Sequence, residues 1–338
     1  MTNMKTNMRR NRIKKFPVAK AFKIALAAVL SILTANLLGL KYAVTAGIIT
    51  VLSIQNTKRE TLRTARNRGL AFLCALLIAF ICYHILGFSV AAFIIYLFLF
   101  ALLCLSAGWG EAIAMDSVLI SHFLAEQSFA QELVLNEILL FVTGTFFGIL
   151  INLHLRKRED MFEKLSQQVD EEIKGIIHRM SENLRREDKT GYHSGCFVHL
   201  EEKITAAKEC ALKNWNNTLL NQSAYELDYI KMRENQSRVL KNIYQSIIMI
   251  RMLPEQTTKV ADFFCEIETQ YHRENDVADL LKQLEEMLND MKNEKLPSNR
   301  DEFEARAVLF YILKQLDEFL MLKNSFVTKY AYHRHAKN

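Results

Sequence analysis

The sequence is poor in residues that interrupt helices or staple a fold. Only three prolines occur in 338 residues, and proline is the residue that cannot continue a helix. The six cysteines show no paired spacing: three lie in apolar runs, where cysteine acts as a small hydrophobic residue, and three are scattered in a polar second half. These features argue against a disulfide framework and predict an all-α chain.

Signatures of catalysis and nucleotide binding are also missing. The sequence contains no GxxxxGK[ST] or GxGxxG loop, no GxSxG elbow and no HExxH pair. His193, Cys196 and His199 stand close together, but no fourth ligand follows at a zinc spacing, so an ordinary polar loop is favoured. We therefore predict neither an enzyme nor a cofactor, and no metal site.

Acidic residues are scarce in the first half of the chain. Residues 1–158 hold 17 Lys and Arg against 6 Asp and Glu, whereas residues 159–338 hold 26 against 31. The basic excess thus belongs to the apolar half, which does not indicate a nucleic-acid partner. Because composition changes at the same point, we predict a transmembrane domain over 1–158 and a cytoplasmic helical domain over 159–338.

Six apolar segments are candidates for helices that cross a lipid bilayer. A spanning helix needs about 20 apolar residues to cross a hydrocarbon core of about 30 Å. Gly39, Gly87 and Gly108 mark turns between segments. The fifth segment is the least apolar, and a re-entrant segment is its alternative. The six segments are 18–38, 42–55, 70–86, 89–107, 109–124 and 133–155.

The basic residues predict the orientation of these segments. The N-terminal tail, residues 58–68 and residues 156–158 are basic, while the alternate loops contain only Lys41 as a cation. Short loops rich in Lys and Arg stay on the cytoplasmic side. Six spans place all three basic segments together. We therefore predict a multi-pass cell-membrane protein with both termini in the cytoplasm, and an uncleaved first segment.

The second half shows helical periodicity throughout. Apolar residues recur at three and four over 162–184 and over 277–291. A break at 189–195 precedes helices near 197–222 and 223–253, and Ser298 or Asn299 is placed to cap a last helix containing Phe303. We predict a bundle of four to six helices.

Ionisable residues inside an apolar segment are the sharpest functional signal, because charges in a membrane are costly and usually face a bundle interior or an aqueous path. The fifth segment contains Glu111, Asp116 and His122, and Glu126 follows it. At about 100° per residue, all but Asp116 share one narrow face. These residues either line a proton or substrate pathway, or Glu111 and Glu126 reach the two interfaces and only Asp116 is deep.

Polar residues follow the second segment. They either line a translocation route or cap the helix. The next stretch is basic and amphipathic, and it either binds anionic lipid headgroups or attracts an anionic substrate. The polar residues are Ser53, Gln55, Asn56 and Thr57, and the basic ones include Arg63, Arg66 and Arg68.

Small residues four apart occur in two segments. In membranes this spacing lets helices approach closely, so it predicts packing first and contact with a second copy only second. The sets are Gly144 with Gly148 in the sixth segment, and Ala27, Ser31, Ala35 and Gly39 in the first.

Several stretches together carry a family resemblance. The element Ser53-Ile54-Gln55-Asn56-Thr57 closes the second segment, and Arg66-x-x-Gly69 leads into the third. Leu296-Pro297-x-x-Arg300 and Phe319-Leu320-x-Leu322-Lys323 lie near the C-terminus. In these stretches the chain resembles the aromatic acid exporter family, in the fusaric-acid-resistance-like group of bacterial membrane proteins. Asn56 stands where that family often has proline.

The resemblance implies efflux of small aromatic or amphipathic carboxylic acids. Larger members of the group fuse two six-helix halves, so a homodimer is the simplest assembly for this chain. Our first hypothesis is a proton-coupled exporter in which Asp116 carries the proton and the basic stretch attracts the anion. The alternatives are a membrane-anchored helical scaffold or sensor that transports nothing, and, third, a membrane enzyme.

Overall fold

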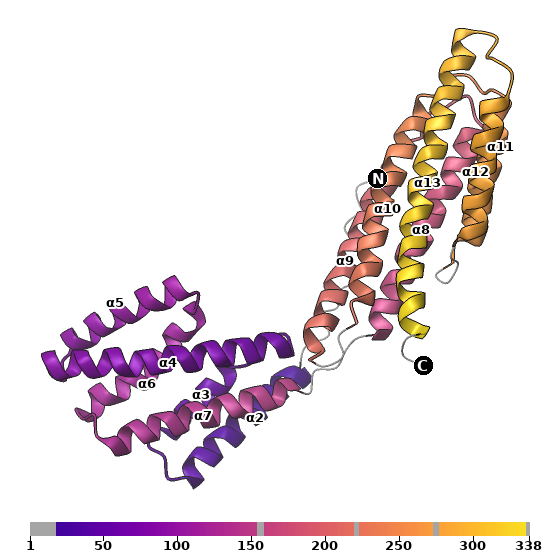
Figure 1. Cartoon of the computed structure of the whole chain (residues 1–338). Helices are drawn as coiled ribbons and strands as arrows, with labels where there is room; N and C mark the ends of the chain where they lie inside the picture. The colour runs from indigo at the N-terminus through magenta and orange to yellow at the C-terminus, as the bar shows by residue number, and fades with distance from the viewer. Residues whose placement is uncertain (1–17, 154–158, 220–222, 273–276, 336–338) are drawn as a thin grey trace, which may run out of the picture. The chain divides into compact units, whose positions relative to one another are not determined.

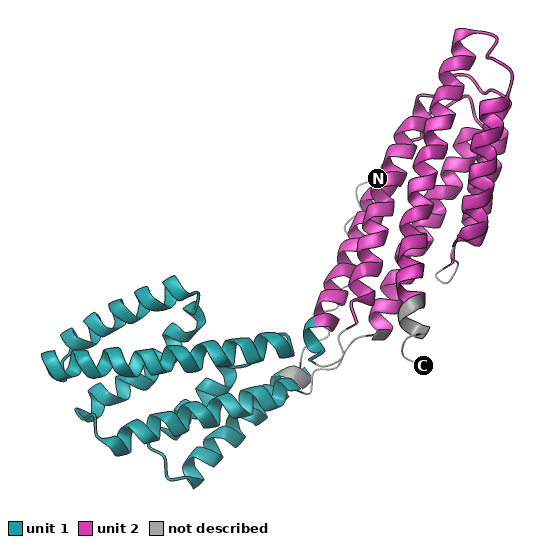
Figure 2. Ribbon diagram, viewed as in Figure 1, with its two compact units in different colours: residues 1–156, 216–220 teal, residues 157–215, 221–338 magenta. Residues whose placement is uncertain are grey.

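The protein is described by a computed structural model covering residues 18–153, 159–219, 223–272 and 277–335. Those ranges contain twelve α-helices, one 3-10 turn and no strand, as the sequence predicts (Figure 1). The chain divides into two compact units (Figure 2). Unit 1 comprises residues 1–156 and 216–220, and unit 2 comprises residues 157–215 and 221–338.

Unit 1 has a helix at each of the six apolar segments. Three of them, α4, α5 and α7, are long and apolar enough to cross a membrane. With 10 and 14 residues, α3 and α6 are shorter than the roughly 20 residues that a spanning helix needs. The helices are α2 (Val18–Leu37), α3 (Ala43–Leu52), α4 (Lys58–Leu86), α5 (Val90–Ala107), α6 (Ile113–Glu126) and α7 (Gln131–Leu153), with the 3-10 turn η1 (Gly110–Ala112) before α6.

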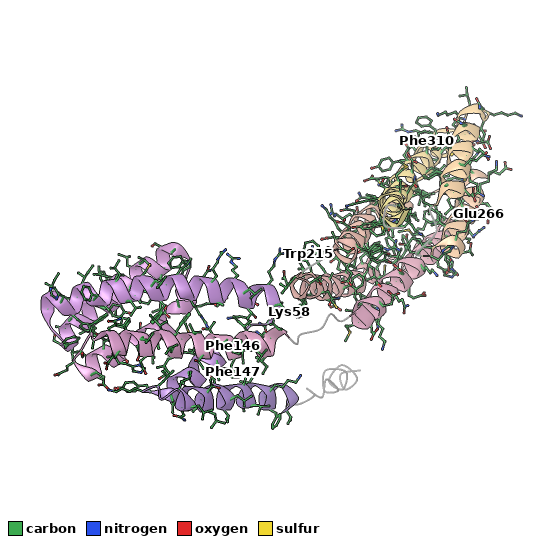
Figure 3. The ribbon with its side chains drawn as sticks, turned by 60° about the horizontal axis from the view of Figure 1, so that its bottom comes forward. Lys58, Phe146, Phe147, Trp215, Glu266 and Phe310 are labelled. Carbon is green, nitrogen blue, oxygen red and sulfur yellow. The ribbon has the colours of Figure 1, made fainter. Side chains whose placement is uncertain are left out.

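The outside of unit 1 is covered by large apolar side chains. In the most apolar 18-residue stretch of α5, only 22% of the residues are buried, and in that of α7 only 28% are buried. Phe146, for example, lies on the surface of α7 (Figure 3). Soluble proteins rarely expose apolar surface of this extent, because water disfavours it. The pattern is that of helices whose outer faces contact lipid.

Helix α4 differs from its prediction. We expected a basic surface segment followed by a separate span beginning near residue 70, but one helix of 29 residues runs through both. Thr57 begins it, accepting a hydrogen bond from the Glu60 main-chain N–H at 3.3 Å. A Thr cap with Glu at the third helical position is a strong start signal, and no proline follows to end the helix before Gly87.

Glycines allow α3 to pack closely against α7. A Cβ added at Gly144 would stand 2.6 Å from Cβ of Ile49, and one added at Gly148 would stand 2.5 Å from Cβ of Ser53. Both distances are far below van der Waals contact. The face bearing these two glycines is therefore occupied inside a single chain.

The core of unit 2 is formed by six amphipathic helices. The apolar residues recurring over 162–184 are buried in it, apart from the half-buried Leu165. Phe303 lies in the last helix, α13, as predicted, and its side chain is 60% exposed. The helices are α8 (Glu159–Leu184), α9 (Cys196–Asn217), α10 (Tyr225–Ile248), α11 (Gln256–Gln270), α12 (Ala278–Asn293) and α13 (Arg300–His335).

Helices α13 and α11 of unit 2 can be compared with the sequence signals that should predict them. Asn299 accepts a hydrogen bond from the Glu302 main-chain N–H at 2.9 Å, so it caps α13 as predicted. Helix α11 was missed, although Val260, Phe264 and Ile267 recur at helical spacing and are buried. Its polar first turn after Pro254 hid the pattern.

Buried charge lies in the middle of unit 2. Arg233 of α10 is fully buried, and its Nε lies 2.9 Å from Oδ1 of Asp170 on α8. The Tyr229 hydroxyl donates to Asp170 at 2.6 Å and accepts from Arg233. Burial raises the pKa of Tyr229 and that of Tyr271, so both phenols stay neutral donors. The guanidinium also lies against both rings, 4.9 and 4.6 Å from their centroids.

Helix α8 offers a simple test of its local energetics. A Cβ added at Gly175 would have no atom of the described residues within 4 Å, apart from its chain neighbours and the backbone of its own helix. Because glycine costs about 1 kcal/mol relative to alanine inside a helix, Gly175→Ala should stabilise unit 2 by up to that amount. Urea unfolding of the full chain, followed by far-ultraviolet circular dichroism, measures the change, and a loss of stability would contradict the open site.

Candidate functional site

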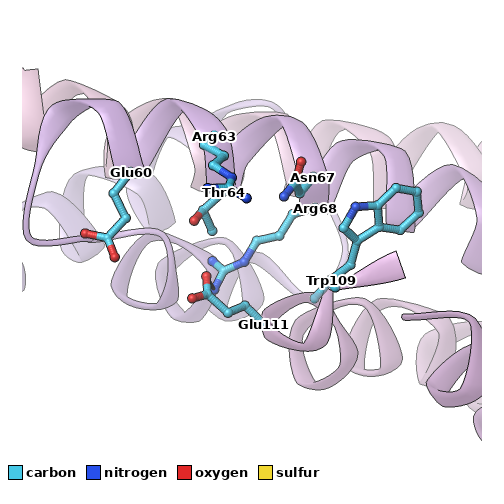
Figure 4. A pocket seen from close by; sticks show the side chains of 9 residues that line it. Glu60, Arg63, Thr64, Asn67, Arg68, Trp109 and Glu111 are labelled. Atoms are coloured by element: carbon cyan, nitrogen blue, oxygen red, sulfur yellow. Dashed lines mark ion pairs between the residues drawn. The ribbon is translucent and has the colours of Figure 1, made fainter. Parts of the chain in front are cut away.

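A pocket of about 230 Å³ lies in unit 1, between the start of α4 and the turn that joins α5 to α6. Glu60 and Trp109 lie at its opposite ends (Figure 4). One wall is the basic first part of α4, and the other is built from the residues around η1. The lining residues are Glu60, Arg63, Thr64, Asn67, Arg68, Gly108, Trp109, Glu111 and Ala112.

Arg68 is the central cation of this pocket. Its side chain is only 7% exposed, and Nη1 donates to the main-chain oxygen of Leu52 at 2.8 Å. Nη2 lies 3.9 Å from Oε2 of Glu111, whose side chain is 58% exposed. Gln55 donates to the same oxygen at 3.3 Å. Nε of Arg68 is buried and has no hydrogen-bond partner among the described residues. The guanidinium is therefore fixed in place but only loosely neutralised.

The remaining lining groups supply other kinds of contact. Trp109 offers an indole face and one N–H donor, and Asn67 and Thr64 offer neutral polar groups from successive turns of α4. Arg63 adds a second, exposed cation. A flat aromatic body with one anionic group fits such a lining, because arginine binds carboxylates and indole stacks on rings.

Asp116 lies near this pocket but does not line it. The residue has no exposed surface, and within the described part of the chain neither carboxyl oxygen has a hydrogen-bond partner. Arg68 is the cation that acts electrostatically on Asp116. Native proteins seldom leave a buried carboxyl unsatisfied, and each such group calls for an explanation.

His122 and Glu126 lie at the other end of unit 1. His122 Nδ1 is 2.7 Å from Oε2 of Glu137 on α7, and the imidazole stacks on the Tyr42 ring with centroids 4.0 Å apart. Glu126 accepts hydrogen bonds from Lys41 at 2.9 Å and from the Tyr42 hydroxyl at 3.1 Å. The loop between α2 and α3 thus meets the end of α6, far along that helix from η1.

The structure divides the residues singled out from the sequence. Gln55, Glu111 and Arg68 lie together, and Arg63 lines the same pocket. Glu111 belongs to η1 and not to α6, so it shares no helical face with His122. Asn56 and Arg66 are exposed and do not line the pocket.

Sequence reasoning overlooked two residues. Trp109 was treated as the first residue of a span, although its position beside a glycine turn and opposite basic residues was visible. Glu137 was passed over although it is a carboxylate inside an apolar segment, the same signal that drew attention to Asp116. It has no exposed surface. Among the described residues, no group of three His, Cys, Asp or Glu side chains is arranged to hold a metal ion.

An apolar helical unit with a cationic and aromatic pocket, joined to a second helical unit, defines a helical membrane protein. The chain belongs to the aromatic acid exporter family: residues 17–155 match "Aromatic acid exporter family member 1", and residues 159–324 match "Putative aromatic acid exporter C-terminal domain".

Two relatives share much of the chain. The "Uncharacterized protein YqjA" of Bacillus subtilis (strain 168) is 26% identical over 309 residues, which cover 91% of this chain and 95% of that protein. The solved structure "Crystal structure of putative membrane protein from Clostridium difficile 630" is also 26% identical. It covers 48% of this chain and 97% of its own, with a TM-score of 0.42.

Proposed function

We propose that this protein exports small aromatic or amphipathic carboxylic acids across the cell membrane, driven by the proton-motive force. The observation that carries the proposal is the pocket in which a buried arginine, only loosely paired with Glu111, lies near Trp109. Family membership supports the general class, and the lining of the pocket supports the substrate.

The pocket suggests how a carboxylate is captured. The substrate carboxylate replaces Glu111 at Arg68, and the released Glu111 is well hydrated because its side chain already lies largely in water. A bidentate contact with the guanidinium is stronger than the present one at 3.9 Å. The aromatic ring then rests against Trp109, which holds it by stacking and apolar burial.

Asp116 is the group proposed to carry the proton. A carboxylate without partners in a nonpolar setting is far more costly than the neutral acid, so its charge depends on what is near it. Arg68 is the cation whose charge acts on Asp116. Export driven by an inward proton gradient exchanges the acid for a proton, so the two are carried in alternate steps. Asp116 takes up a proton on the outer side after the acid has left, and it releases that proton to the cytoplasm, where the free Arg68 favours the ionised carboxylate, before the next acid binds.

The proposed topology keeps six spans, with both termini in the cytoplasm. In that arrangement the basic start of α4 and the turn between α5 and α6 face the cytoplasm, where the exported acid is produced. Two of the basic segments behind this orientation, the N-terminal tail and residues 156–158, lie outside the described residues. The homodimer stays a prediction.

Uptake into inverted vesicles tests the pocket. Vesicles containing the purified protein and an acidic lumen should accumulate an aromatic acid such as benzoate. Arg63→Gln should raise the KM for uptake by about tenfold, because it removes a lining cation. Arg66→Gln is the matched control, three residues away on the same helix but outside the pocket, and should leave KM unchanged. Equal effects of the two variants would contradict the pocket.

The proton step has its own test. Asp116→Asn should abolish accumulation driven by the pH gradient, because asparagine cannot exchange a proton. Undiminished accumulation by this variant would remove Asp116 from the mechanism. If no aromatic acid moves with any variant, while the full chain captures a defined partner through residues 159–338, the scaffold hypothesis replaces transport.

A further inference from the structure

We propose that Glu137 and His122 form a second proton-binding site, at the end of unit 1 opposite the pocket, which exchanges protons with the solution on that side. The proposal deepens the transport function above and rests on it for its role, but not for its chemistry. Two helices that follow each other in the chain, α6 and α7, each contribute one titratable group to the site.

The two groups contact each other directly and lie out of water. His122 Nδ1 and Glu137 Oε2 are 2.7 Å apart, within hydrogen-bond distance. The side chain of Glu137 has no exposed surface, and that of His122 retains 9%. Water therefore reaches the pair from the imidazole side only. Nε2, the ring nitrogen that does not contact Glu137, faces Oγ1 of Thr45 at 3.5 Å.

The surroundings hold the pair in position without neutralising it. Asn136 donates to the other carboxylate oxygen of Glu137 at 3.0 Å, and the Tyr42 ring covers the imidazole. The nearby charges are already matched: Lys41 lies 2.9 Å from Glu126, and Glu126 also accepts from Tyr42. Glu132, in the first turn of α7, is exposed. No free cation among the described residues of this end is left to balance an ionised Glu137.

Charge balance then determines how many protons the pair holds. A neutral imidazole beside an ionised carboxylate leaves one net negative charge in a nonpolar site, which is costly. One added proton makes the pair neutral overall, and we place it on Glu137, because a neutral imidazole beside a neutral acid avoids the cost of burying two charges. The added proton removes the net charge of the site, and the pair can pass that proton on to a neighbour or to water.

The imidazole provides a route for that proton. A proton from solution binds Nε2, the proton on Nδ1 moves to Oε2 of Glu137, and the product is a neutral imidazole beside a neutral acid. Release reverses these steps, and no electrons are exchanged. Asp116 lies six residues before His122 on the same helix, about 9 Å along its axis. The two proton sites are therefore on one helix and at two depths.

Infrared spectroscopy of the full chain in lipid nanodiscs tests the site without any transport. The carbonyl stretch of a protonated, buried carboxyl group should appear as pH falls, and Glu137→Gln should remove one such band. Glu137→Gln keeps the shape of the side chain, so the pair's hydrogen bonds to His122 and Asn136 remain available. Glu132→Gln is the matched control on the exposed face of α7 and should remove no buried-carboxyl band.

Two further variants sharpen the result. Asp116→Asn should leave the Glu137 band in place, which separates the two sites. His122→Asn should keep that band but shift the pH at which it appears, because the partner no longer titrates. A Glu137→Gln spectrum identical to that of the wild type would overturn the proposal. So would a carboxyl band whose midpoint pH is the same in His122→Asn as in the wild type.

Transport measurements then test the role of the site. With Glu137→Gln, exchange of labelled for unlabelled substrate without a pH gradient should continue, while accumulation driven by the gradient should be lost. Equal accumulation by the variant and the wild type would overturn the role. If no form transports at all, the proposed function fails, and the infrared bands still decide whether the pair binds a proton.

Discussion

Asp170→Ala is expected to destabilise unit 2 by about 3–5 kcal/mol, the cost of leaving a buried charge without its partner. Arg233 has no exposed surface, and Asp170 is the carboxylate that contacts it, at 2.9 Å. Without that carboxylate, the guanidinium would keep only neutral partners. These are the hydroxyls of Tyr229 and Tyr271 and the amide oxygen of Gln236.

The loss should be large because the network is closed. Gln236 also donates to the main-chain oxygen of Phe319 on α13 at 2.8 Å, so α8, α10 and α13 are joined through one set of hydrogen bonds. Breaking a solvent-exposed ion pair would cost far less stability, usually below about 1 kcal/mol. Glu171→Ala supplies that comparison, since Glu171 is exposed and lies 3.9 Å from Lys174 one turn later.

The chain offers a convenient reporter for this experiment. Only two tryptophans occur, Trp109 in unit 1 and Trp215 in unit 2. In a Trp109→Phe background, Trp215 fluorescence during urea titration of the full chain in detergent reports on unit 2. A change for Asp170→Ala no greater than that for Glu171→Ala would show that Arg233 is not held by its charge partner.

Gly148→Ala should destabilise unit 1 by about 1–3 kcal/mol, the usual cost of forcing a methyl group into a filled site. The added carbon would stand 2.5 Å from Cβ of Ser53 and 3.1 Å from the main-chain oxygen of Thr50. Neither atom is the mobile end of a side chain. The only relief is for α3 and α7 to separate, which removes contacts along both helices.

Gly69→Ala is the matched control in the same unit. The nearest atom to its added Cβ is a ring carbon of Phe141 at 3.9 Å, an ordinary contact. Unfolding of each variant by increasing the fraction of a denaturing detergent, followed by circular dichroism, should separate the two. If Gly148→Ala is as stable as Gly69→Ala, α3 and α7 do not approach as closely as described.

The sequence predicted the helical elements well where a single physical signal dominated. Apolar length alone located the helices of unit 1, and Gly87 and Gly108 marked turns because both adopt positive φ angles there. Periodicity located α8 and α12 because their buried faces recur at three and four. The boundary of α4 was misplaced because a change from polar to apolar composition does not interrupt a helix.

The candidate site was predicted less completely, since proximity between segments leaves no trace in composition. Gln55 and Glu111 are 56 residues apart, and only folding brings them together. Asp116 could be recognised by its chemistry inside an apolar segment. Trp109 and Glu137 also carried sequence signals that were overlooked, but the contacts that these residues make could not be read from those signals. The pairing of Glu137 with His122 is provided only by folding.

The continuity of α4 has a mechanical consequence. A helix of 29 residues is about 43 Å long, whereas the hydrocarbon core measures about 30 Å, so the end bearing Arg63 extends beyond the apolar layer when the rest is immersed. The segment contains no proline to act as a hinge. Because the helix has no hinge, a tilt of the end that bears Arg63 also moves Ala79 and Cys82, which pack in the interior of the unit.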